Sequence, residues 1–231
     1  MLGASTRLVA LLGHPVAHSL SPRMQNAAFA ARGLDWAYVA LDVVPDELET
    51  AVRGLVASGY AGANVTIPHK RAAPALCDEA DGDAVNTLVF ADGLIAGFNT
   101  DKEIVAGIES SRVCLIGAGG AAAALLPGLH GEVRQFSRRG DWPPNAADCD
   151  LIVNATPVRD ELLVEPHAGQ TVVELAYGEG ETALVRAARA AGCAVIDGRE
   201  ALVRQGAASF ERWTGVPAPV SVMRAALGLS A

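Results

Sequence analysis

The sequence lacks the basic character that nucleic-acid and membrane-surface proteins need. Its 18 Lys and Arg residues are outnumbered by 26 Asp and Glu residues, giving a formal net charge of −8 and an isoelectric point near 5.1. This balance argues against nucleic acid or an anionic membrane as a partner, because both require a basic face. An anionic substrate would need a locally basic pocket.

Cysteine is sparse and unpaired in the sequence. The four cysteines are dispersed and form no C-x-x-C pair, so neither zinc nor a thioredoxin-like motif is expected. No cluster of His, Cys and acidic residues is evident, and we expect no metal. We interpret these cysteines as reduced core thiols of a cytoplasmic protein; they are Cys77, Cys114, Cys149 and Cys193.

Long hydrophobic runs are also missing. The apolar run 8–13 ends at His14-Pro15, which makes it too short for a signal peptide, and nothing approaches a transmembrane span. Hydrophobic residues nevertheless make up 51 % of the 231 residues and charged residues 19 %. This composition predicts a packed core rather than disorder.

Strand-length apolar runs alternate with Ala- and Leu-rich helical stretches, which predicts an α/β protein with mostly parallel strands. We expect strands at 8–12, 36–43, 63–66, 83–86, 87–90, 94–99, 113–116, 133–136, 151–154, 171–175 and 194–196. Helices are expected at 21–32 with Ser21 as N-cap, 46–58, 121–129, 182–191, 201–213 and 220–227, with further helices opening at Pro68-His69-Lys70 and at a Thr100/Glu103 capping box. Segment 140–148 is expected to be a loop.

A glycine-rich turn follows the strand at 113–116 and opens a helix. The string Gly117-Ala118-Gly119-Gly120-Ala121-Ala122 fits the dinucleotide fingerprint G-x-G-x-x-A. The first glycine permits the tight turn, the second admits the pyrophosphate, and the small third residue lets helix and strand pack closely. Glycines also occur in such turns for packing alone, so the motif needs support from its context.

The context is the end of the following strand, where the type of residue selects the cofactor. The position holds Ser137-Arg138-Arg139, with no carboxylate before Asp141. A guanidinium binds a 2′-phosphate that a carboxylate would repel, so the sequence favours NADP, with NAD possible. The alternative is two solvated arginines in a surface turn.

Polar residues follow three other strand ends, where an open α/β sheet presents its crevice. Ser19 and Ser21 place two hydroxyls at a helix start, a seat for a carboxylate unless Ser21 only caps the helix. Lys70 follows the strand at 63–66, although a lone lysine is usually solvated. Asp101 follows Asn99-Thr100 and could be simply an acidic residue of a first helical turn. We interpret nearby His14, His18 and His69 as structural.

Together these segments resemble the shikimate dehydrogenase family in order and spacing. The matching strings are Gly13-x-Pro15-x-x-His18-Ser19-x-Ser21-Pro22, Asn64-Val65-Thr66-x-Pro68-x-Lys70, Val85-Asn86-Thr87, Gly97-x-Asn99-Thr100-Asp101, the glycine turn, Asn154-Ala155-Thr156-Pro157, Asp197-Gly198, Gln205 and Phe210-x-x-Trp213-Thr214-Gly215. The resemblance covers essentially the whole chain.

The resemblance implies NADP-dependent interconversion of 3-dehydroshikimate and shikimate, with Lys70 and Asp101 as the catalytic pair. An ammonium stabilises the charge that builds on the ketone oxygen and supplies the proton. The implied substrate-binding residues are Ser19, Ser21, Thr66, Asn86, Tyr177 and Gln205. The implied cofactor-binding residues are Gly117, Ala118, Gly119, Gly120, Ala121, Ser137, Arg138, Arg139, Asn154, Ala155 and Thr156.

The implied architecture has two domains with the site in a cleft between them. Residues 1–102 and 199–231 would bind substrate, and residues 103–198 would form a Rossmann-type NADP domain, in a monomer or homodimer. The chain departs from the family at Gln25 (usually His), at Arg159-Asp160 (usually Gly-Met) and at Ala201 (usually Met), and the usual proline after the tyrosine is absent from Tyr177-Gly178-Glu179. It is also shortened at 140–150 and after 160. Quinate or another cyclic hydroxy acid as substrate, or a non-catalytic NADP sensor, therefore remain alternatives.

Overall fold

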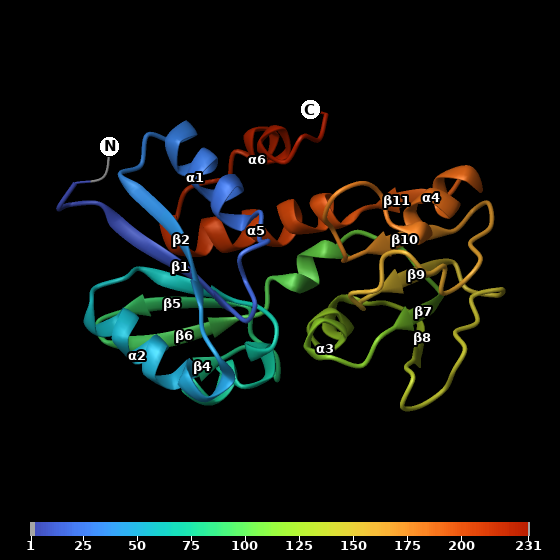
Figure 1. The fold of residues 1–231 in the computed structure, drawn as a ribbon, viewed down its shortest axis with the longest axis horizontal. Helices are drawn as coiled ribbons and strands as arrows, with labels where there is room; N and C mark the ends of the chain where they lie inside the picture. Colours follow the sequence, from blue (N-terminus) through green and yellow to red (C-terminus); the bar gives the residue numbers. More distant parts are fainter. Residues whose placement is uncertain (1–2, 231) are drawn as a thin grey trace. The chain divides into compact units, whose positions relative to one another are not determined.

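The computed structural model describes residues 3–230, which form two compact units. Unit 1 comprises residues 1–100 and 203–231, and unit 2 comprises residues 101–202. The expected boundaries at 102 and 198 lie two and four residues from this division. One boundary falls within a helix, α5 (Gly198–Thr214). Figure 1 shows the elements of each unit.

Unit 1 contains a six-stranded mixed sheet in the order β2-β1-β3-β5-β6-β4. Its strands are β1 (Arg7–Gly13), β2 (Trp36–Asp42), β3 (Gly62–Val65), β4 (Glu79–Ala80), β5 (Thr87–Ala91) and β6 (Leu94–Phe98). β1 lies parallel to both β2 and β3, and the β5–β6 hairpin continues the sheet antiparallel to β3. This arrangement confirms the mixed α/β class, with a hairpin at 87–98 as predicted.

Helices cover both faces of this sheet (Figure 1). Leu48, Val52 and Leu55 of α2 (Leu48–Ala57) pack into one apolar cluster with β1, β3, β5 and β6. The other helices of the unit are α1 (Ser21–Ala31), the later part of α5, and α6 (Val220–Ala226). Phe29 of α1 stacks on Phe210 of α5, with ring centroids 5.4 Å apart.

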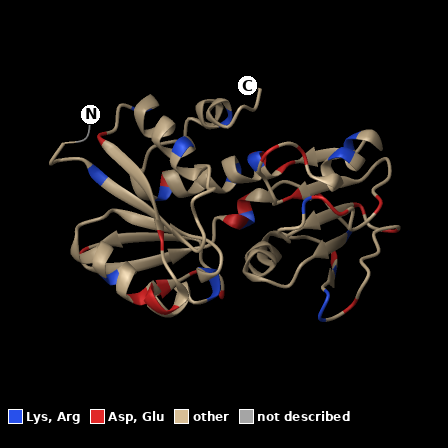
Figure 2. Cartoon of the chain, in the orientation of Figure 1, with Lys and Arg blue, Asp and Glu red and all other residues tan. Residues whose placement is uncertain are grey.

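Unit 2 contains five parallel strands in the order β11-β10-β9-β7-β8. They are β7 (Arg112–Ile116), β8 (Glu132–Phe136), β9 (Leu151–Asn154), β10 (Thr171–Glu174) and β11 (Ala194–Ile196). Counted from β7, this is the doubly wound order 2-1-3-4-5. Its helices are α3 (Gly120–Leu125) and α4 (Ala183–Ala190), together with the start of α5. Charged residues of both units lie mainly outside the strand centres (Figure 2).

Two crossovers of unit 2 contain no helix. Segment 140–148 is irregular, as predicted, and so is the connection 155–170 between β9 and β10. Ala146, Cys149 and Leu163 from these segments are buried against β7, β9 and β10. Gln170 holds one segment in place, because its amide donates to the carbonyl oxygens of Ala146 (2.8 Å) and Cys149 (2.7 Å). Buried side chains of these irregular segments thus pack on the sheet together with Leu184 and Ala188 of α4, which belong to the same cluster.

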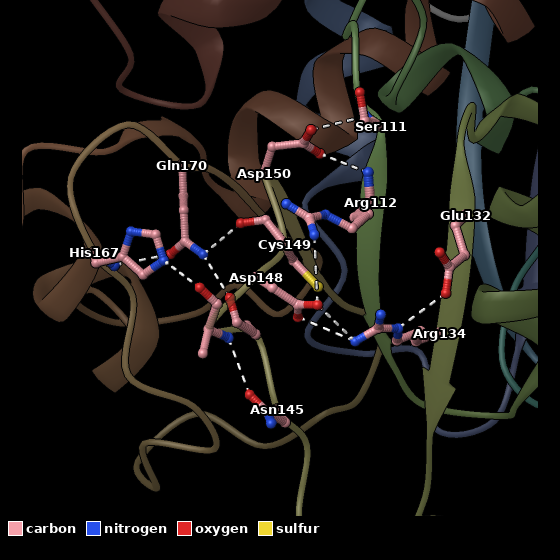
Figure 3. A network of polar contacts seen from close by, with 12 residues as sticks. Ser111, Arg112, Glu132, Arg134, Asn145, Asp148, Cys149, Asp150, His167 and Gln170 are labelled. Carbon is pink, nitrogen blue, oxygen red and sulfur yellow. Dashed lines mark hydrogen bonds and ion pairs between the residues drawn. The ribbon is translucent and has the colours of Figure 1, made fainter.

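Charged residues tie together the end of the unit 2 sheet where its strands begin (Figure 3). Asp150 accepts backbone hydrogen bonds from Ser111 (2.8 Å) and Arg112 (3.0 Å). Burial opposes ionisation of Asp150, but backbone hydrogen bonds, these two among them, and the nearby charge of Arg112 together lower its pKa. Arg134 pairs with Asp148 at 3.0 Å and with Glu132 at 3.1 Å. These contacts fix the strand starts, opposite the edge at which ligands bind to such sheets.

Several local predictions were wrong. Ser21 is the first residue of α1, and Leu20 occupies the N-cap position without a side-chain cap. The short strand is Glu79–Ala80 instead of 83–86, and 3-10 helices, η2 (His69–Arg71) and η3 (Ala73–Leu76), replace the helix expected near Pro68. Helix α3 ends at Leu125 rather than 129 because Pro127 cannot donate to the helix ladder.

The capping box at Thr100 and Glu103 was also wrong, since only a 3-10 helix, η4 (Asp101–Ile104), follows. The Thr100 hydroxyl is engaged elsewhere, at 3.1 Å from Asn86 Oδ1 and 3.0 Å from Ser209 Oγ. A hydroxyl bound to other side chains does not cap a helix.

Candidate active site

In unit 1, the loops after β1 and β3 lie side by side because the two strands are parallel neighbours. His14 N donates to Ile67 O (3.0 Å), and Thr66 N donates to Leu12 O (2.9 Å). Gly13 is required for this approach, since a Cβ there would come within 2.5 Å of Thr66 Cγ2. The strand order reverses at β1, which is the point where open α/β sheets bind ligands.

The loop after β1 carries the two serines. Ser19 Oγ accepts a hydrogen bond from Ser21 N at 3.2 Å. Ser21 is buried and is the first residue of α1, whose N-cap position is occupied by Leu20. The interpretation of Ser21 as only a helix cap is therefore not supported.

The loop after β3 carries Thr66 and Lys70, both half-buried. Val85 N donates to Lys70 O (2.9 Å), and Val65 N donates to Asn86 O (2.8 Å). These bonds bring the backbone of Lys70 and of β3 next to Asn86. His69 is buried and its Nε2 lies 2.7 Å from Val43 O, in keeping with a structural role.

Behind these loops lies a buried network of neutral polar groups. Asn64 donates to Asn86 O (2.9 Å), Thr87 Oγ1 (3.1 Å) and Ser209 Oγ (3.1 Å), and accepts from the Tyr38 hydroxyl at 2.7 Å. Asn86 Oδ1 in turn accepts from Thr100 N at 2.8 Å. The network fixes Asn86 through hydrogen-bonded neighbours on several elements.

Helix α5 contributes Gln205 and Ser209 to the same network. Asn86 Nδ2 lies 3.4 Å from Gln205 Oε1, and Ser209 Oγ lies 2.8 Å from Thr87 Oγ1. The structure thus brings together the predicted Asn86 and Gln205. Sequence reasoning missed Ser209, although its position four residues after Gln205 places both on one helix face.

Asp101 is buried and begins η4, the first element of unit 2. The preceding residue, Thr100, belongs to the unit 1 network. Lys70 lies in unit 1, so the Lys70–Asp101 pairing stays a prediction.

In unit 2, the glycine turn joins β7 to α3 where that sheet reverses its strand order. Gly117 has a φ of 122°, and its added Cβ would come within 3.1 Å of Ala155 O. A Cβ on Gly119 would meet nothing within 4 Å, so this glycine is not needed for packing. Ala122 is fully buried against β7. The open space over Gly119 fits the close approach of a pyrophosphate to the backbone.

The turn after β8 presents its two arginines to solvent. Gly140 N donates to Ser137 O (2.9 Å), which closes the turn with Arg138 and Arg139 exposed at its tip. Arg138 Nη2 pairs with Glu161 Oε2 at 3.0 Å, and its Cζ lies 5.6 Å from the ring centre of Trp142. The positive charge of this turn suits a phosphate.

Asn154, at the end of β9, is held by a buried acid. Its amide donates to both carboxyl oxygens of Glu174 (3.1 Å each), and its Oδ1 accepts from Thr156 N at 3.0 Å and from Thr156 Oγ1 at 2.7 Å. Glu174 is 0 % exposed, and burial raises its pKa despite bonds from Ala176 N, Asn154 and the Thr182 hydroxyl. Sequence reasoning missed Glu174, whose only signal is an acid at a buried strand end.

The four cysteines are free thiols. Burial raises the pKa of Cys77 to about 11 and that of Cys114 to about 12. Among residues 3–230 no group of three or more His, Cys, Asp or Glu residues is placed to hold a metal ion. No helix in that range has the length and apolar character needed to cross a bilayer.

Comparisons with known proteins match this chain over nearly its whole length. A family model described as the shikimate dehydrogenase substrate-binding domain matches residues 11–88, and one for the shikimate 5′-dehydrogenase C-terminal domain matches residues 198–227. A protein of Rubrobacter xylanophilus named shikimate dehydrogenase (NADP(+)) is 42 % identical over 279 aligned positions, covering 98 % of this chain and 97 % of the relative. The chain belongs to the shikimate dehydrogenase family.

Solved structures of shikimate dehydrogenases agree with this fold. One in complex with NADP+ has a TM-score of 0.89 at 32 % identity and covers 98 % of this chain and 96 % of its own. Another, from Thermus thermophilus with NADP(H) and shikimate, has a TM-score of 0.84 at 32 % identity, covering 95 % and 98 %. A quinate dehydrogenase from Corynebacterium glutamicum with NAD has a TM-score of 0.82 at 26 % identity, covering 96 % and 98 %.

The alignment with the Rubrobacter relative spans more positions than the 231 residues of this chain, so part of the relative has no counterpart here. Segments 140–148 and 155–170, near which the sequence predicts a shortened chain, contain no helix.

Proposed function

We propose that this protein is an NADP-dependent shikimate dehydrogenase that reversibly reduces 3-dehydroshikimate to shikimate in aromatic amino acid biosynthesis. The observation that carries the proposal is the shared geometry of the two units. In each, functional loops follow the first and third strands of a 2-1-3 order, with Lys70 in one unit and the glycine turn in the other.

The cofactor site would be formed by unit 2. Gly117, Ala118, Gly119, Gly120 and Ala121 would line the pyrophosphate, Ser137, Arg138 and Arg139 the 2′-phosphate, and Asn154, Ala155 and Thr156 the nicotinamide. The open position over Gly119 and the exposed arginines support this fit. NADPH, when bound, supplies the hydride; NAD would lack the phosphate that the arginines bind.

The substrate site would be formed mainly by unit 1. Ser19 and Ser21 would bind the carboxylate, and Thr66, Asn86 and Gln205 the ring hydroxyls, with Tyr177 of unit 2 near the carboxylate end. The buried position of Ser21 next to Ser19 and the contact between Asn86 and Gln205 support these roles.

Catalysis would rest on Lys70 and Asp101. As hydride reaches the ketone carbon, negative charge develops on the oxygen, and the Lys70 ammonium would stabilise that charge and donate the proton. In the reverse direction the Lys70 amine would accept the hydroxyl proton. Asp101 would orient Lys70 and the reacting hydroxyl.

A spectrophotometric assay tests the proposal. NADP+ and NAD+ are each combined with shikimate and with quinate, and formation of the reduced nicotinamide is followed by its absorbance. We expect NADP+ with shikimate to give the highest kcat/KM. Faster turnover of quinate would make quinate the substrate. Quinate is included because the fold is similar to that of the quinate dehydrogenase from Corynebacterium glutamicum. NADP binding without turnover in all four mixtures would indicate a sensor.

The proposal also includes a cytoplasmic location, with the molecule acting as a monomer or homodimer on small molecules alone. Four free cysteines and a net charge of −8 support this setting.

A further inference from the structure

Arg159 occupies a position where the family usually has glycine, and it contacts a second departure from the family pattern. Its Nη2 donates to Glu179 O at 2.6 Å and to Gly180 O at 3.0 Å. A Cβ on Gly178 would overlap Arg159 Nη1. The arginine therefore lies against a loop residue that has no side chain, within the stretch Tyr177-Gly178-Glu179 that lacks the proline usual after the tyrosine.

The loop that Arg159 contacts, residues 175–182, connects β10 to α4 and carries Tyr177. We call it the β10–α4 loop. Glu174 ties its two ends together, because one carboxyl oxygen accepts from Ala176 N (2.9 Å) and the other from the Thr182 hydroxyl (3.0 Å). The base of the loop is thus fixed by a buried acid, while its middle depends on arginine side chains.

Arg159 gives the middle of the loop two hydrogen bonds through Nη2. Arg199 also reaches the loop, at 3.3 Å from Gly178 O. In residues 3–230, no carboxylate forms an ion pair with Arg159, so its bonds go to loop carbonyl oxygens. Its Nε is buried without a partner in that range. A buried donor without a partner lowers the free energy of unfolding. The hydrogen bonds from Nη2 to the loop must therefore hold the guanidinium in place.

We propose that Arg159 is a positioning residue that holds the β10–α4 loop, and with it Tyr177, in the conformation needed to bind substrate. Only the effect on substrate binding rests on the proposed function; the effect on the loop itself does not. A proline following the tyrosine would restrict the backbone directly, whereas here an arginine restricts it through two charge-assisted hydrogen bonds.

The test compares Arg159→Gln with Arg32→Gln. Arg32 also donates to a backbone carbonyl oxygen, from Nε to Pro217 O at 2.8 Å, but it lies in unit 1 and does not contact the β10–α4 loop. We expect Arg159→Gln to accelerate amide hydrogen exchange at 178–181 by about tenfold or more. KM for shikimate should rise about 5–20-fold, with kcat and KM for NADP+ changing less than about threefold. Arg32→Gln should resemble the wild type in all four measurements.

A double-mutant cycle provides a second readout. Gly178→Ala places a methyl group on Arg159 Nη1 and should displace the guanidinium, so this variant should reproduce the raised KM. In Arg159→Gln/Gly178→Ala the KM should be no higher than in the worse single variant, because both changes break one contact. Additive effects would overturn the proposal.

The outcomes separate this inference from the proposed function. Unchanged amide exchange at 178–181 in Arg159→Gln would show that Arg159 does not hold the β10–α4 loop, whether or not the enzyme turns over shikimate. Faster exchange with an unchanged KM for shikimate would overturn the positioning role. A wild type without shikimate turnover would contradict the proposed function, while the exchange data would still decide whether Arg159 holds the loop.

Discussion

The two units place functional loops by the same topological rule but support them with different chemistry. In unit 1, β1 is flanked by β2 and β3; in unit 2, β7 is flanked by β8 and β9. The loops of unit 1 rest on neutral hydroxyl and amide groups such as Asn64 and Ser209. The corresponding loop of unit 2 rests on the buried acid Glu174. Strand order therefore determines where a site forms, and the supporting side chains determine how it responds to mutation and pH.

The largest expected effect tests whether catalysis depends on unit 1 while NADPH binding depends on unit 2. Lys70→Ala should lower kcat by roughly a thousandfold, because the ammonium acts on charge that develops in the transition state. The affinity for NADPH, measured by fluorescence titration, should stay near that of the wild type. The chain has one other lysine, Lys102, and Lys102→Ala is the matched control. An active Lys70→Ala enzyme would remove Lys70 from the mechanism.

The next prediction concerns the glycine turn of unit 2. Gly119→Val should fold normally, because its Cβ meets open space, yet its affinity for NADPH should fall by at least about tenfold as the side chain blocks the pyrophosphate. Thermal unfolding and NADPH titration measure the two properties separately. Gly82→Val, another open position, should change neither. Unimpaired NADPH binding by Gly119→Val would show that the turn does not hold the cofactor.

Unit 1 should be sensitive at its buried network. Ser209→Ala removes contacts with Asn64, Thr87 and Thr100 and should lower the free energy of unfolding by about 1–3 kcal/mol, because buried polar groups lose partners. Urea denaturation measures the change. Ser110→Ala, whose hydroxyl makes one exposed bond to His130 O, should cost less than about 0.5 kcal/mol. Equal effects would show that the buried contacts of Ser209 add nothing to stability.

The smallest expected effect is a dependence of stability on pH, which the buried acid Glu174 of unit 2 should cause and the neutral groups of unit 1 should not. Burial raises the pKa of Glu174 above its ordinary value of 4.5. The folded state then keeps this proton to a higher pH than the unfolded chain, so stability should decline as pH rises from about 4.5 through the raised pKa. Glu174→Gln should lack this decline when urea denaturation is repeated across the range. A decline of equal size in both proteins would assign it to other groups.

Periodicity and motif spacing predicted the fold well where they report burial. The parallel strands of unit 2 were all identified, and the clearest signals were runs such as Val113–Ile116, which are buried on both faces. Helix starts were predicted less well. Ser21 and Thr100 have the residue types of caps, but neither caps a helix. A tertiary contact decided the outcome for Thr100, and local sequence does not contain it.

Sequence reasoning likewise identified only part of the candidate site. Family strings identified Asn86 and Gln205, which the fold brings together. They did not identify Ser209 or Glu174, whose importance comes from partners distant in sequence: Ser209 meets Asn64 from 145 positions away, and Glu174 meets Asn154 from 20. Such partners become visible only when strand pairing and helix packing are known.

The position of Trp142 gives unit 2 its own optical signal. The chain has three tryptophans, and the other two, Trp36 and Trp213, belong to unit 1. The indole of Trp142 lies 5.6 Å from the guanidinium of Arg138 and is partly open to water. If the 2′-phosphate of NADP binds Arg138 as proposed, the emission of this ring should change, while the other two tryptophans report on unit 1. Nucleotide binding could then be followed without a label or a turnover assay.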